Sequence, residues 1–295
     1  MRSGISQPAA DSDSLTGMVA ALLLILKVTV MTVILAIGMD STLEDLTYLW
    51  RRPGLLVRSL LAMYVFVPLV ALLFVKFLAL PPGVEVALLV LAVSAGGLLL
   101  PRKLMGIGEG SYVFSLVVLS SLLAIVTVPA WLAVFGPWFG DSIDLIPMEV
   151  ARVIGRVFLL PLVVGMLARW LIPEISSRMS DKLLKVGGAV LALCILLLLV
   201  TNGSLILEAG WPALLTLAAM TLVAMCIGHV MGGPDPDNRT VLAISCATRH
   251  AGLVVLVAAS VPGPRTAALV GAYFVASAIV TIPYLRWRRR TLADS

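Results

Sequence analysis

The stretch "VLAISCATRHAGLVVLV", residues 241–257, carries the pair Arg249-His250 in the middle of an apolar segment. A second basic pair, Arg102-Lys103, lies in "AVSAGGLLLPRKLMGI", residues 92–107. Charge within a membrane span is unfavourable, so each pair needs a function or a partner. The residues around both pairs are small or break helices: Gly96, Gly97 and Pro101 in the first stretch, and Ser245, Ala247, Thr248 and Gly252 in the second. Two interrupted helices in corresponding halves of a membrane protein indicate the binding site of a secondary transporter.

Composition indicates a polytopic all-α membrane protein. Hydrophobic residues make up 60% of the 295 residues and charged residues 13%, and the mean hydropathy is +1.08, which excludes a soluble domain. We expect one transmembrane domain over residues 1–295, without cofactor. The net charge of +5 does not imply nucleic acid, because membrane proteins concentrate Lys and Arg in cytoplasmic loops. The three cysteines lie in apolar runs and predict neither a disulfide framework nor a metal site: Cys194, Cys226 and Cys246.

Apolar runs bounded by Pro, Gly or charge predict nine transmembrane helices, at 17–39, 54–79, 84–107, 111–136, 147–171, 183–207, 211–232, 240–261 and 266–285. A polar segment at 1–16 precedes them and a basic tail at 286–295 follows. Most basic loop residues fall on the same side as this tail, so we expect a cytoplasmic C-terminus and an external N-terminus. The expected location is a bacterial-type inner (plasma) membrane, with membrane lipid as a partner.

The predicted membrane interior is basic. Every Asp and Glu falls in a predicted loop or within about a turn of a helix end. Arg102 and Arg249 cannot lose their protons, and no buried carboxylate pairs with them. A small organic anion is the expected partner, because Arg presents a planar fork and the end of a broken helix exposes N–H groups.

Other polar residues near the two pairs have more than one interpretation. Ser245 and Thr248 can supply hydroxyl groups to the anion. His250 can couple transport to protons or be a neutral core histidine. Lys103 can bind the anion or reach the membrane interface, and the single basic residues at membrane depth are expected to extend toward the interface: Lys27 and Arg156.

Several motifs resemble the bile acid:sodium symporter family. They are "ILAIGMDSTLEDLTYLWRRPGLLVRSLLAMYVFVPLVALLF" at 34–74, "SAGG" at 94–97, "SLVVLSSLLAIVTVP" at 115–129 and "RTVLAISCATRHAGL" at 239–253. The resemblance implies an inverted-repeat carrier with panel and core domains and two broken helices that cross at the substrate site. Four helices at 17–136 then form the first repeat, and five at 147–285 form the second.

The departures from the family concern sodium. Where sodium-coupled relatives carry Ser-Asn after the double Gly, this chain runs Leu98 to Lys103. Where they carry a Glu and then a Gln-Asn pair, it has Ser245, Arg249 and His250. Fixed positive charge repels Na⁺, so we do not expect sodium coupling.

The resulting hypothesis is a secondary transporter of a small organic anion that works by alternating access without Na⁺. Two alternatives stay open. One is a Na⁺-coupled symporter whose ion site uses carbonyls and hydroxyls such as those of Ser120 and Thr127, and the other is a non-transporting sensor or scaffold on the same fold. An enzyme is not expected, because no metal-binding, triad or phosphate-loop motif is present.

Overall fold

The computed structural model describes residues 24–25, 27–94, 110–139, 148, 151–152, 155–201, 203–249, 254 and 264–293. These residues are almost entirely helical, and none of them forms a strand. After a helix at 27–40, the elements are α2 (Leu43–Thr47), α3 (Pro53–Leu61), η1 (Ala62–Phe66), α4 (Val67–Phe77), α5 (Pro82–Val93), α7 (Gly110–Phe139), η2 (Gly155–Leu159), α9 (Leu160–Leu171), α10 (Pro173–Thr201), α11 (Gly203–Met231), α12 (Pro236–Ala247) and α14 (Pro264–Ala293).

The helix lengths agree with an integral membrane protein. Within the described ranges, four helices are long and apolar enough to cross a membrane: Pro53–Phe77, Pro173–Thr201, Gly203–Met231 and Leu269–Thr291. A pair of apolar helices bent by 48°, Gly110–Ser120 with Leu122–Gly136, is either a fifth span that is broken or a re-entrant segment. The described residues do not test the nine spans or the two inverted repeats, which stay predictions.

Three helix boundaries differ from the predicted ones. α10 begins at Pro173, so the predicted loop at 172–182 is wrong; proline suits the first helical position and Glu174 suits the positive end of the helix dipole. α11 begins at Gly203 but has a kink at Gly210, whose φ of 74° favours glycine. α14 continues to Ala293, so most of the predicted basic tail is helical.

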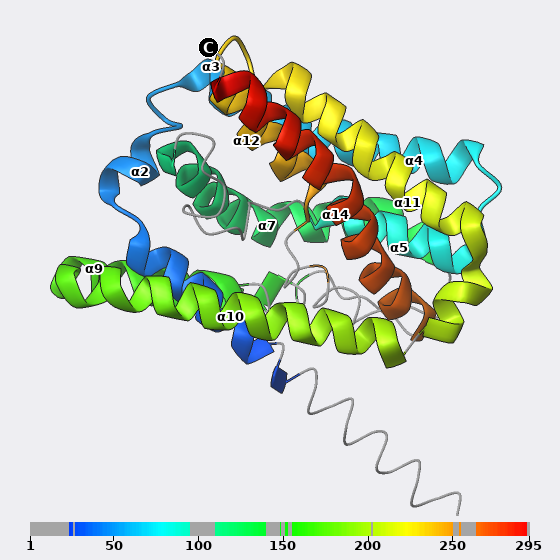
Figure 1. The fold of residues 1–295 in the computed structure, drawn as a ribbon, viewed down its shortest axis with the longest axis horizontal. Helices are drawn as coiled ribbons and strands as arrows, with labels where there is room; N and C mark the ends of the chain where they lie inside the picture. Colours follow the sequence, from blue (N-terminus) through cyan, green and yellow to red (C-terminus); the bar gives the residue numbers. More distant parts are fainter. Residues whose placement is uncertain are drawn as a thin grey trace, which may run out of the picture.

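The helices form two layers (Figure 1). The helix at 27–40, α9 and α10 lie together along one side, and α4, α5, α7, α11, α12 and α14 lie across from them. Contacts between the layers join α10 to α14 and to α11, and η2 to α7. The buried apolar residues form one main cluster that includes parts of both layers.

Glycines bring the backbones of the first layer into direct contact. A Cβ atom on Gly165 would lie 2.2 Å from the carbonyl oxygen of Leu35 and 3.0 Å from the Cα of Gly38. A Cβ on Gly187 of α10 would lie 2.5 Å from a methyl carbon of Val33. The helix at 27–40 therefore packs on α9 and α10 at distances that only glycine permits.

We expect Gly165→Ala to lower the melting temperature in detergent by several degrees, because the new methyl group forces the backbones apart at a cost of about 1–3 kcal/mol. Gly188→Ala is the matched control, because nothing lies within 4 Å of its Cβ position and alanine favours the helix. Equal melting temperatures for the two variants would contradict the close packing.

Arg288 of α14, which is 8% exposed, attaches α14 to the beginning of α12. The Arg288 Nε donates to Thr240 Oγ1 at 2.9 Å, and its Nη2 donates to the Pro236 carbonyl at 2.8 Å. Nearby, His229 of α11 shares a 2.7 Å hydrogen bond with the Tyr284 hydroxyl. Hydrogen bonds between polar side chains thus connect α14 to both α11 and α12 in this region.

Arg288→Lys keeps the charge but removes the pair of hydrogen bonds that the guanidinium makes with α12. We expect a loss of about 1–3 kcal/mol of stability, because hydrogen bonds to a charged group contribute about that much. Arg290→Lys, at an exposed position on the same helix, should leave the melting temperature unchanged. Thermal unfolding of the two proteins in one detergent distinguishes them, and a comparable loss in both would argue against a specific role for Arg288.

Candidate substrate site

Two helices end inside the bundle in the same manner. α5 ends at Val93 and α12 ends at Ala247, and the residue that follows each is a hydroxyl residue. Ser94 donates its N–H and its Oγ to the Val90 carbonyl at 3.2 and 2.8 Å. Thr248 donates its N–H and its Oγ1 to the Ile244 carbonyl at 2.8 and 2.7 Å. The predicted interruptions thus begin with two buried helix ends.

Arg249 follows the end of α12 and is 5% exposed. Its Nη1 has no hydrogen-bond partner, and no carboxylate pairs with it in the described part of the chain. The guanidinium acts electrostatically on three buried neutral groups, the hydroxyls of Tyr64 and Tyr273 and the thiol of Cys246. A permanent positive charge therefore lies in the core without a compensating negative one among these residues.

Ser245 reinforces this polar site. Its side chain is fully buried, and its Oγ has no hydrogen-bond partner. Buried side-chain polar atoms are normally paired, and each unpaired one requires an explanation. Within the described ranges only four such atoms occur, and two of them are Ser245 Oγ and Arg249 Nη1, four residues apart in the chain.

α14 holds the end of α12 in place. The hydroxyl of Tyr273 and the Oγ of Ser277 both donate to the carbonyl of Ala247, the latter at 3.3 Å. That carbonyl belongs to the last turn of α12 and lacks a helical donor. The two α14 side chains therefore fix the backbone immediately before Arg249.

Tyr64, on η1, is held by a different helix. Pro68 has no N–H, so the Tyr64 carbonyl four residues earlier loses its usual donor, and the chain widens into the π-turn of η1. The Trp131 Nε1 of α7 donates to this carbonyl at 3.0 Å, and the Tyr64 hydroxyl donates to the Ser120 carbonyl at 3.0 Å. α7 thus satisfies the bond that proline removes and fixes Tyr64.

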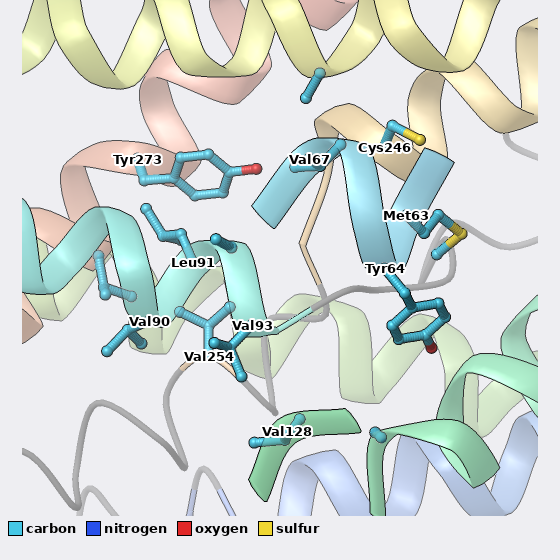
Figure 2. Packing of buried hydrophobic residues seen from close by; sticks show 14 of the residues in the cluster. Met63, Tyr64, Val67, Val90, Leu91, Val93, Val128, Cys246, Val254 and Tyr273 are labelled. Carbon is cyan, nitrogen blue, oxygen red and sulfur yellow. The ribbon is translucent and has the colours of Figure 1, made fainter. Parts of the chain in front are cut away.

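Apolar side chains fill the region between these polar groups. Figure 2 shows Tyr273 and Tyr64 on opposite sides of it, with Cys246 of α12 nearby. Apolar side chains from the end of α5, from η1 and α4, and from α7 lie around these groups: Leu91, Val93, Met63, Val67 and Val128. The described surroundings of the end of α12 are therefore largely apolar.

The structure brings together three of the predicted site residues, Ser245, Thr248 and Arg249, at the end of α12. Thr248 uses its hydroxyl proton within the chain, so only its oxygen is available to a ligand as an acceptor. The other predicted residues lie outside the described residues: Gly96, Gly97, Pro101, Arg102, Lys103, His250 and Gly252.

Sequence reasoning missed Tyr64, Tyr273 and Ser277. The sequence does contain a signal for such residues: each is a polar group in an apolar helix, and a buried tyrosine hydroxyl normally requires a hydrogen-bond partner.

A cavity of about 350 Å³ lies elsewhere, between the beginnings of α5, α11 and α14, and none of the predicted site residues lines it.

The model of the sodium bile acid symporter family matches residues 27–209, more than half of the chain. The chain belongs to this family. Members of the sodium bile acid symporter family are membrane transporters, not enzymes, so the chain is a transporter-like integral membrane protein. A search of curated proteins gave no match. The matched range includes the first layer and α5 and ends before α12, so Arg249 lies beyond it.

We expect Tyr273→Phe to lower stability by about 1 kcal/mol, because the Ala247 carbonyl loses a buried donor. Ser277→Ala should have a smaller effect, since the Tyr273 bond to the same carbonyl remains. Melting temperatures of the two variants in one detergent provide the comparison. A larger loss in Ser277→Ala would show that Tyr273 is not the main support of this carbonyl.

Proposed function

We propose that this protein is a secondary transporter of a small organic anion that works by alternating access without sodium coupling. The observation that supports the proposal best is Arg249, a buried guanidinium with an unpaired Nη1 at a helix end. A carboxylate or sulfate oxygen would satisfy this donor, and the Ser245 Oγ offers a second hydrogen bond. Arg102, Lys103 and His250 are proposed to complete the site.

The same charge argues against a cation at this position. Two unit charges about 4 Å apart repel by about 4 kcal/mol at an effective dielectric constant of 20. The carbonyl of Ala247, an oxygen that could otherwise bind Na⁺ at the end of α12, already accepts hydrogen bonds from Tyr273 and Ser277. A sodium site elsewhere, near Ser120 and Thr127, is the alternative to be tested.

The test is a thermal-shift screen of the purified protein in detergent with keto acids, pantoate, taurocholate and sulfate esters, in NaCl and again in KCl. A bound ligand stabilises by mass action, by about 2.7 kcal/mol at 100 times its dissociation constant. We expect particular anions to stabilise the protein equally in both salts. A shift that requires Na⁺ would favour the sodium-coupled alternative.

Arg249→Gln should abolish the anion-dependent shift, because glutamine is uncharged and does not reach the position of the guanidinium. Arg156→Gln is the matched control: it removes an exposed arginine at membrane depth, and the shift should persist. An unchanged shift in a folded Arg249→Gln protein would overturn the assigned role. The absence of any shift in the native protein with all these anions would favour the sensor or scaffold alternative.

A further inference from the structure

Arg249 has a consequence for the transport cycle, and this inference rests on the proposed function. Arginine stays protonated at any accessible pH, so the site carries its positive charge throughout the cycle. Arg249 Nη1 has no hydrogen-bond partner, and no carboxylate of the described residues pairs with this charge. A bound anion pairs with this charge, whereas a site without an anion leaves it unpaired.

The guanidinium is also held in the core. The backbone before it is fixed to α14 through the two bonds to the Ala247 carbonyl, and the beginning of α12 is fixed to α14 through Arg288. α12 is therefore attached to α14 at both ends. Arg249 cannot reach water at one surface by a local movement of α12 without breaking these contacts.

Alternating access requires a state in which the site is closed to both sides of the membrane. With an anion bound, this state contains a paired charge, which is tolerated when the geometry is good. Without an anion, the same state contains a buried guanidinium that no carboxylate of the described residues pairs with, which is strongly unfavourable. The loaded transporter can therefore pass through the closed state much more easily than the unloaded one.

We propose that this protein is an anion exchanger: after it releases one organic anion, its site reopens to the other side of the membrane only when a second organic anion occupies Arg249. Uptake of one anion is then linked to release of another, and net movement of a single anion is slow. The substrate class is an organic anion with an apolar body, because a fixed positive charge and apolar side chains make up the described part of the site.

The experiment uses proteoliposomes of the full-length native protein, loaded with one of three radiolabelled monoanions: pyruvate, pantoate or taurocholate. Efflux is measured into KCl buffer alone and into the same buffer with the unlabelled anion. Potassium with valinomycin on both sides prevents a membrane potential from building up, since such a potential would slow net efflux for an unrelated reason.

We expect at least tenfold faster efflux when the anion is present outside, which corresponds to about 1.4 kcal/mol in the barrier of the return step. Equal efflux rates in the two buffers would overturn the exchange mechanism and leave the proposed anion transporter intact. Efflux no faster than from protein-free liposomes, for all three anions and in both buffers, would instead count against the proposed function. Arg156→Gln should keep the native ratio of the two rates.

Discussion

The buried charge of Arg249 is the constraint on which the candidate site depends. A guanidinium in the core is tolerated only if its surroundings are fixed and its hydrogen bonds can be completed. α14 supplies the fixation, because Tyr273 and Ser277 bind the carbonyl that ends α12. The burial of Arg249 and the break of α12 are thus two parts of one arrangement.

The surrounding helices support that arrangement through specific defects in regular structure. Proline at position 68 removes a backbone donor, and the Trp131 side chain replaces it. The ends of α5 and α12 use Ser94 and Thr248 to bond back onto their own last turns. Each irregularity is compensated by a named side chain, which is how a membrane protein can place non-helical backbone in its interior.

Part of this arrangement could be predicted from the sequence. Arg249 stood out because a charge in an apolar run is unfavourable, and the small residues before it indicated the end of a helix. Tyr64 and Tyr273 could not be distinguished from ordinary core aromatics, because their roles depend on which helices are neighbours. The start of α10 was missed for a related reason: its first turns are polar and resemble a loop until packing against the helix at 27–40 is known.

The glycines of the first layer have a mechanical consequence. Gly38 and Gly165 bring the backbones of two helices into contact, and Gly187 brings the backbone of α10 against a methyl group of Val33. At these three contacts no glycine side chain can change rotamer. Interfaces of this kind have one arrangement of low energy, so we expect these three helices to move together as one rigid unit. The contact of α10 with α14 includes larger side chains, Leu191 and Phe274, so we expect any sliding between the two layers to occur at that boundary.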